Sequence, residues 1–166
     1  MNIFDYAMEI EKEGEKAYRG LSAQSSSNEM KALFDWLAEA ELNHYNIFQK
    51  MKNQENPSIQ ESSLLQDAVN IFTEMKKNKT SVSFKGFEKD AYDIVLSIEE
   101  KMADFYNEKA NEAKDPAQKA LFQSIAKEEK QHQHLIENLI KMIHNPETWI
   151  QNENFKEILN VVSSNK

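Results

Sequence analysis

Residues 30–51 read MKALFDWLAEAELNHYNIFQKM. Apolar side chains recur in this segment at intervals of three and four residues, which is the spacing of an amphipathic α-helix with one buried stripe. The stripe consists of Met30, Phe34, Leu37, Glu41, His44, Phe48 and Met51. It is apolar except at its middle, where a glutamate is followed three residues later by a histidine. A fold that buries this stripe must therefore also bury Glu41 and His44.

Three further segments have the same periodicity, so we predict four long helices, over residues 3–23, 29–51, 87–113 and 116–143. In each of them the apolar stripe has one polar interruption. The stripes of the other three helices are Phe4, Ala7, Glu11, Gly14, Tyr18 and Leu21; Tyr92, Val95, Glu99, Met102 and Tyr106; and Phe122, Ile125, Glu129, His132, Ile136, Leu139 and Ile143. The first and third helices carry one glutamate, and the second and fourth carry a glutamate and a histidine.

The connections indicate how the helices are arranged. Residues 24–28 and the pair Asp115-Pro116 are short breaks with helix-capping chemistry, so each should join an antiparallel hairpin. The connection over residues 52–86 is long, and the amphipathic stretch from Leu64 to Met75 predicts one short helix within it. Two hairpins with a long crossover form the ferritin-like four-helix bundle, an all-α fold. We predict a bundle over residues 1–145 and a C-terminal helical tail, residues 146–166, packed on it.

Composition excludes several classes of function. The chain has 166 residues with only 3 glycines and 3 prolines, which suits a few long helices. A net charge of −8 disfavours binding to nucleic acid or to an anionic membrane, and no stretch approaches the roughly 18 apolar residues of a membrane helix. The absence of cysteine excludes disulfides and thiolate metal sites, and fits a reducing compartment such as the cytoplasm. No signal peptide is predicted at the N-terminus.

The polar residues within the stripes pose an electrostatic problem. An ionised carboxylate in a dry core costs several kcal/mol, and four of them at one level would repel one another. Two divalent cations solve both problems, because four positive charges balance four carboxylates while two neutral imidazoles add further ligands. The predicted ligands are Glu11, Glu41, His44, Glu99, Glu129 and His132. Carboxylate oxygens combined with imidazole nitrogens suit iron or manganese, with zinc as an alternative.

An internal repeat supports this interpretation. A shift of 88 residues superimposes the polar positions of the two halves, and residues 31–34 and 119–122 both read KALF. In each half the two glutamates are 30 residues apart, so two equal hairpins should bring both sets to one height around a pseudo-twofold axis. The matched pairs are Glu11 and Glu99, Tyr18 and Tyr106, Glu41 and Glu129, and His44 and His132.

Over residues 3–143 the pattern resembles the rubrerythrin-like branch of the ferritin-like di-iron proteins. The resemblance lies in Glu11 with Tyr18, Glu41-Leu42-Asn43-His44, Glu99 with Phe105-Tyr106, and Glu129-Lys130-Gln131-His132, and residues 146–149 (PETW) are similar to tails in that group. It implies that Glu41 and Glu129 bridge two iron ions, while Glu11 and Glu99 are terminal ligands. His44 and His132 would each bind one ion. Tyr18 and Tyr106 would hydrogen-bond ligand carboxylates.

The resemblance also implies an oxidoreductase that reduces hydrogen peroxide or dioxygen. Rubrerythrins proper carry a cysteine-ligated iron centre as electron donor, and this chain has no cysteine, so electrons must come from a separate donor protein or small molecule. Rubrerythrins also place a further carboxylate one turn after the third-helix ligand. Here that position is Met102, and its repeat mate is Gly14, so the ligand-switching peroxidase mechanism is not carried over. The fold class further implies a homodimer.

Three alternatives remain open at this point. The chain could oxidise and store iron as ferritins do, which requires a large hollow shell. It could be a non-enzymatic helical module in which metals only hold the bundle together, or a di-manganese protein with catalase-like activity. Pairing of the buried glutamates with lysine or arginine is disfavoured, because none lies on the stripes. His134 and His144 have no glutamate three residues earlier and are predicted at the surface.

Overall fold

A computed structural model describes residues 2–58, 70, 73 and 89–145, and within them it contains four long helices and no strand. The helices are α1 (Ile3–Gln24), α2 (Asn28–Lys52), α4 (Lys89–Glu112) and α5 (Pro116–His144). Each boundary lies within two residues of the predicted one. The predicted crossover helix and the predicted C-terminal tail lie outside the described residues.

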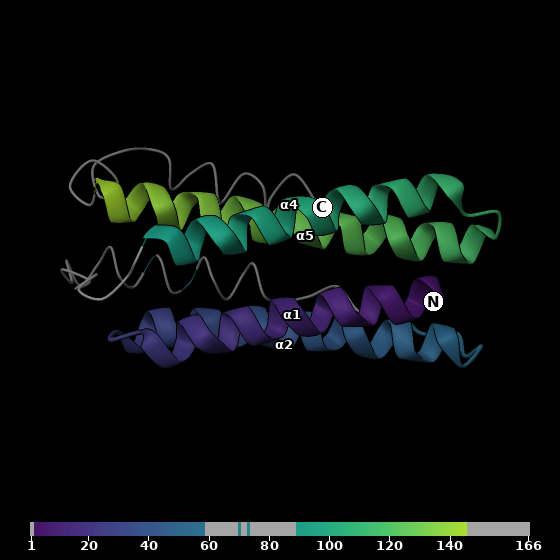
Figure 1. The fold of residues 1–166 in the computed structure, drawn as a ribbon, viewed down its shortest axis with the longest axis horizontal. Coiled ribbons are helices and arrows are strands. Elements are labelled where there is room, and N and C mark those ends of the chain that lie inside the picture. Colours follow the sequence, from purple (N-terminus) through teal and green to yellow (C-terminus); the bar gives the residue numbers. More distant parts are fainter. Residues whose placement is uncertain (1, 59–69, 71–72, 74–88, 146–166) are drawn as a thin grey trace.

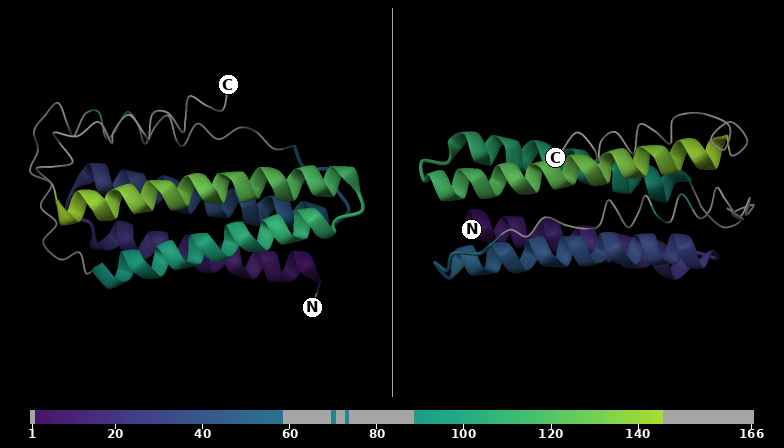
Figure 2. Two further views of the ribbon diagram at one scale, coloured as in Figure 1. Left: turned by 90° about the horizontal axis from the view of Figure 1, so that it is seen from above. Right: turned by 180° about the vertical axis from the view of Figure 1, so that it is seen from behind.

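The four helices form two hairpins that lie side by side along the long axis of the molecule (Figure 1). α1 packs mainly against α2 and α4 mainly against α5, and α1 also contacts α4 across the two hairpins. The views from above and from behind show the same pairing, with the hairpins forming the two halves of one bundle (Figure 2). The predicted all-α, ferritin-like four-helix architecture is therefore confirmed.

Short polar side chains determine where three of the helices begin. The side chains of Asn2, Ser27 and Asp115 accept hydrogen bonds from the backbone N–H groups of Phe4, Met30 and Gln118, at 3.1, 3.2 and 3.0 Å. These bonds satisfy N–H groups that have no partner within the helix. Pro116 follows the Asp115 cap at the start of α5, where its missing N–H carries no penalty. The caps at Ser27 and Asp115 start the second helix of each hairpin directly after the short connection predicted from the sequence.

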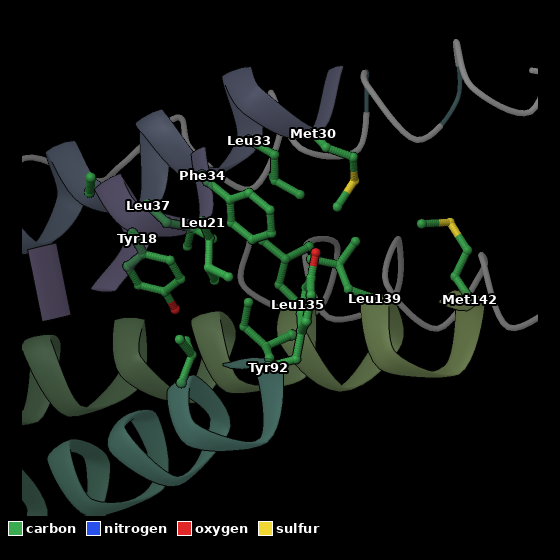
Figure 3. Close-up of a cluster of buried hydrophobic side chains, with 13 residues drawn as sticks. Tyr18, Leu21, Met30, Leu33, Phe34, Leu37, Tyr92, Leu135, Leu139 and Met142 are labelled. Atoms are coloured by element: carbon green, nitrogen blue, oxygen red, sulfur yellow. The ribbon is translucent and has the colours of Figure 1, made fainter. Parts of the chain in front are cut away.

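The apolar core consists of two clusters, one toward each end of the bundle. The first is drawn in Figure 3 and contains Tyr18, Leu21, Met30, Leu33, Phe34, Leu37, Ala38, Tyr92, Val95, Leu135, Ile136, Leu139 and Met142. The second contains Ala7, Ile47, Phe48, Met102, Tyr106, Ala110, Leu121, Phe122, Ile125 and Ala126. The polar stripe positions fall between these clusters along every helix, so the fold encloses a polar layer at mid-length.

The predicted stripes are buried along almost their whole length. Only the terminal members Phe4, Met51 and Ile143 are half-buried. Residues beside the stripes, such as Leu33 and Leu121, are buried as well, because a helix in a bundle buries a face wider than a two-position seam. The other faces are charged, and no helix in the described ranges is both long enough and apolar enough to span a membrane.

Candidate metal centre

All six predicted ligands lie together in the polar layer between the two apolar clusters. Glu11 comes from α1, Glu41 and His44 from α2, Glu99 from α4, and Glu129 and His132 from α5. Each of the six residues is at most 4% exposed. The helical period explains the convergence, because a glutamate and a histidine three residues apart lie on the same face of their helix. The bundle thus holds four carboxyl groups and two imidazoles away from water.

The six residues form two overlapping groups of four. Glu11, Glu41, His44 and Glu129 each offer a ligand atom, and these atoms lie within 4.8 Å of one another. Glu41, Glu99, Glu129 and His132 do the same. Glu41 and Glu129 belong to both groups, so their two oxygens can serve two neighbouring cations. The 88-residue repeat relates the residues of one group to those of the other.

The inner atoms of these groups have no hydrogen-bond partner among the described residues. They are Glu11 Oε2, both oxygens of Glu41, His44 Nδ1, Glu99 Oε2, both oxygens of Glu129, and His132 Nδ1. His44 Nδ1 lies 2.8 Å from Glu129 Oε1 and His132 Nδ1 lies 3.1 Å from Glu41 Oε1, but neither contact has hydrogen-bond geometry. Buried polar atoms are rarely left unpaired, and cations among these eight atoms would satisfy them. The donor set therefore fits two divalent metal ions.

Glu11 and Glu99 each belong to only one of the two groups, and a tyrosine binds the outer oxygen of each. Tyr18 on α1 donates its hydroxyl hydrogen to Glu99 Oε1 on α4, and Tyr106 on α4 donates to Glu11 Oε1 on α1. Figure 3 shows the Tyr18 hydroxyl pointing across the bundle toward the other hairpin. Burial, and then the facing glutamate, raise the pKa of both tyrosines, so both keep the proton that they donate. Each glutamate is thereby held with Oε2 turned inward.

The four carboxyl groups of the cluster differ in the direction of their net pKa shifts. Burial and the charge of Glu129 raise the pKa of Glu11 well above its ordinary value. Burial and the charge of Glu41 do the same for the pKa of Glu99. Without a cation, both groups are therefore held as neutral acids over a wider pH range than a glutamate in water.

The shared glutamates and the histidines are held in their charged forms. Burial by itself raises the pKa of Glu41 and Glu129, but contacts with His44 and His132 lower both below the ordinary value. Burial by itself lowers the pKa of the two histidines, but the charges of the facing glutamates raise both well above the ordinary value. In the absence of a cation these directions favour two carboxylates that face two imidazolium groups.

Gly14 gives Glu41 room to lie against α1. A Cβ atom at Gly14 would lie 3.3 Å from Cγ, 3.5 Å from Cδ and 3.7 Å from Oε2 of Glu41. The first of these distances is tighter than an ordinary contact, so a methyl group there would displace the shared carboxyl group by a few tenths of an ångström. Its repeat mate on α4 is Met102, which is fully buried in the second apolar cluster. Glycine is thus needed on one side of the centre only.

This close approach predicts different outcomes for two glycines of the same helix. Gly20→Ala replaces a helical glycine and should gain about 1 kcal/mol of helix stability, which is roughly 2–4 °C in the unfolding midpoint of the metal-free protein, whereas the contact with Glu41 should reduce that gain in Gly14→Ala. Only Gly14→Ala should also weaken metal binding, since a Cβ at Gly20 would meet no atom within 4 Å. Calorimetric titration and thermal unfolding of both variants measure this. Equal metal affinities in the two would contradict it.

Glu128, which adjoins the shared Glu129 on α5, is a further residue of the centre that was not predicted from the sequence. Its Oε2 lies 2.9 Å from His44 Nε2, the ring nitrogen that faces away from the cluster. Glu128 lies off the apolar stripe and its partner is 84 residues away, so helical periodicity alone could not identify it. The signal that was available is the doublet Glu128-Glu129, whose counterpart one repeat earlier is Ala40-Glu41.

The residues predicted to lie outside the centre do so. His134 has a side chain 53% exposed and His144 is also exposed, and neither belongs to either group of ligand atoms. Met102, at the position where rubrerythrins carry a further carboxylate, is apolar and fully buried. The structure therefore provides four glutamates for the centre among the described residues.

The fold and this cluster together define a class of protein: four-helix bundles with carboxylate and imidazole groups gathered at mid-length. The chain belongs to the rubrerythrin family, since the family model described as Rubrerythrin matches residues 2–140. This is a family of ferritin-like di-iron carboxylate proteins. The match agrees with the resemblance seen over residues 3–143. Comparisons with curated proteins and with solved structures give no match.

Proposed function

We propose that the protein is a di-iron oxidoreductase that reduces hydrogen peroxide or dioxygen, with electrons supplied by an external donor. The observation that carries the proposal is the pair of four-residue groups that share Glu41 and Glu129. A bundle that needed one structural ion would require only one such group. Two adjoining groups, matched by the repeat, provide a pair of sites at one level of the core.

The residues have distinct roles in this proposal. Glu41 and Glu129, which belong to both groups, and Glu11 and Glu99, which belong to one group each, would hold the ions. His44 and His132 would contribute Nδ1, the nitrogen that faces the unpaired oxygens. The tyrosines hold the outer oxygens of the two singly used glutamates and limit their rotation. The two apolar clusters on either side keep bulk water from the layer.

When bound, two ferrous ions would supply one electron each, which matches the two-electron cleavage of an O–O bond. In the overall reaction hydrogen peroxide takes up two electrons and two protons and gives two molecules of water. The external donor must then return two electrons for each turnover. The chain itself has no cysteine with which to hold a second iron centre for this purpose.

Anaerobic stopped-flow spectroscopy tests the proposal. Protein loaded with two equivalents of Fe²⁺ should be oxidised by peroxide much faster than Fe²⁺ free in the same buffer, as measured by near-ultraviolet absorption. His132→Ala should lose this acceleration, and the matched variant His134→Ala on the same helix should keep it, because His134 is exposed and outside the centre. Oxidation no faster than that of free Fe²⁺ would overturn the proposal.

The metal and the partners belong to the same proposal. Iron is favoured by the family, although manganese and zinc accept the same donors. The metal content of protein expressed with each metal supplied separates these cases. We further propose a homodimer that uses a separate electron-donor protein. The mass measured by size-exclusion chromatography checks the dimer, and a large shell would instead favour iron storage.

A further inference from the structure

The two histidines of the centre differ in what holds their outer nitrogens. His44 Nε2 lies 2.9 Å from Glu128 Oε2, and the side chain of Glu128 is only 15% exposed. This bond leaves Nδ1 as the nitrogen that can bind a cation, and it fixes the plane of the ring. A carboxylate in this position also makes the imidazole a stronger electron donor toward a metal.

Among the residues that the structure describes, His132 has no equivalent partner. The residue that corresponds to Glu128 one repeat earlier is Ala40, which is buried and has no hydrogen-bonding side chain. No hydrogen bond to His132 Nε2 occurs within the part of the chain that the structure describes. In the atoms that can bind a cation the two halves match, since both have an inward Nδ1, two shared glutamates and one glutamate held by a tyrosine. Glu128 is therefore a difference between two otherwise similar sites.

We propose that Glu128 makes the centre unequal, so that the half with His44 binds its cation first and the half with His132 binds second and more weakly. The inference rests on the proposed di-metal function. Loss of a carboxylate that orients a metal-binding histidine typically lowers metal affinity 10- to 100-fold, so the two binding constants should differ by about that factor. Glu128 is a positioning residue here, because it acts on the metal through His44.

Titration of the metal-free protein with Mn²⁺ measures both constants and shows the order of binding. Calorimetry should give two steps separated about 10- to 100-fold. At one equivalent the electron paramagnetic resonance spectrum should be that of isolated Mn²⁺. At two equivalents it should become that of a magnetically coupled pair.

Removing each histidine in turn identifies the halves. His132→Ala should keep the tighter step and lose the weaker one, whereas His44→Ala should lose the tighter step. The opposite pattern would overturn the inference. So would equal constants in the unaltered protein.

Variants of Glu128 test the cause of the difference. Glu128→Ala should weaken the tighter step 10- to 100-fold and leave the weaker step unchanged, so that the two merge. Glu128→Gln keeps an oxygen that can accept a hydrogen bond from Nε2–H of His44. Its tighter binding constant should therefore lie between those of the unaltered protein and of Glu128→Ala. Glu137→Ala, on the same helix and away from the centre, is the control and should leave both constants unchanged. Two well-separated steps in Glu128→Ala would overturn the inference.

These outcomes separate the two proposals. If the protein binds two ions with equal affinity, the di-metal function stands and the role of Glu128 is wrong. If the protein binds neither Mn²⁺ nor Fe²⁺, both are wrong.

Discussion

Loading the protein with two divalent cations is expected to raise its midpoint of thermal unfolding by about 10–20 °C. A ligand that binds only the folded state at 100 times its dissociation constant adds about 2.7 kcal/mol of stability, so two add about 5 kcal/mol. In a chain of this size, each kcal/mol corresponds to roughly 2–4 °C. Scanning calorimetry with Fe²⁺ under anaerobic conditions, and with a chelator, measures the difference.

Glutamate variants show whether this gain comes from the proposed centre. Glu41→Gln should abolish the rise in the unfolding midpoint from both ions, because Glu41 belongs to both groups. Glu11→Gln should abolish the rise from one ion only. Glu39→Gln on the same helix should keep both, since Glu39 is exposed and its ion pair with Arg19 is a surface pair of small value. Each variant is compared with and without metal, which removes its effect on the metal-free fold. An unchanged gain in Glu41→Gln would contradict the assignment.

Metal binding is expected to release protons, up to four for each pair of ions bound. In the metal-free cluster Glu11 and Glu99 have raised pKa values and are held as neutral acids, and both histidines have raised pKa values and are held as cations. Binding requires four carboxylates and two neutral imidazoles, so two acids and two imidazolium groups each lose one proton. If all four protons are bound at the start, their release balances the four positive charges of two divalent ions.

The sign of the pH dependence follows from this exchange. Each released proton makes the overall binding constant rise tenfold per pH unit while that proton is still bound in the metal-free state. The constant for two ions should therefore rise by up to about 10⁴-fold per pH unit and fall as steeply on acidification. Calorimetric titration in buffers of different ionisation enthalpy counts the protons. A count near zero would show that the four groups are already deprotonated without metal.

The same groups affect the stability of the metal-free protein in the opposite direction. A group whose pKa is raised by folding stabilises the fold below its unfolded pKa, and this contribution is lost as pH rises through its folded pKa. Glu11, Glu99 and both histidines are of this kind. The stability gained on metal loading should consequently grow as the pH rises.

Much of the fold could be predicted because its signals are local. The spacing of three and four residues is a property of the helix itself, so the stripes predicted from Met30 or Phe122 are the ones that the bundle buries. The caps at Ser27 and Asp115 likewise depend on residues next to them in the chain. The crossover helix and the C-terminal tail stay predictions, since they lie outside the described residues.

The centre was predictable only in part. The sequence identifies the six ligand candidates as polar residues within apolar stripes, related by an 88-residue repeat. They are expected to lie together because burying each of them alone would be unfavourable. Contacts between distant segments could not be foreseen in the same way. The bond from His44 to Glu128 joins residues 84 apart, and neither helical periodicity nor the repeat contains that information. The close approach of Glu41 to Gly14 likewise depends on how α1 and α2 pack.

The amino-acid sequence by itself determined four amphipathic helices, two hairpins and one polar layer of six residues, since these follow from periodicity, capping and the cost of burying charge. Only the tertiary structure decided which atoms face one another. Its packing shows that Glu41 and Glu129 are common to both groups, and that each tyrosine binds a glutamate of the other hairpin. It also shows that the outer nitrogen of His44 contacts the carboxylate of Glu128, whereas no described residue does the same for His132. Such distances arise when separate helices pack, and no single segment encodes them.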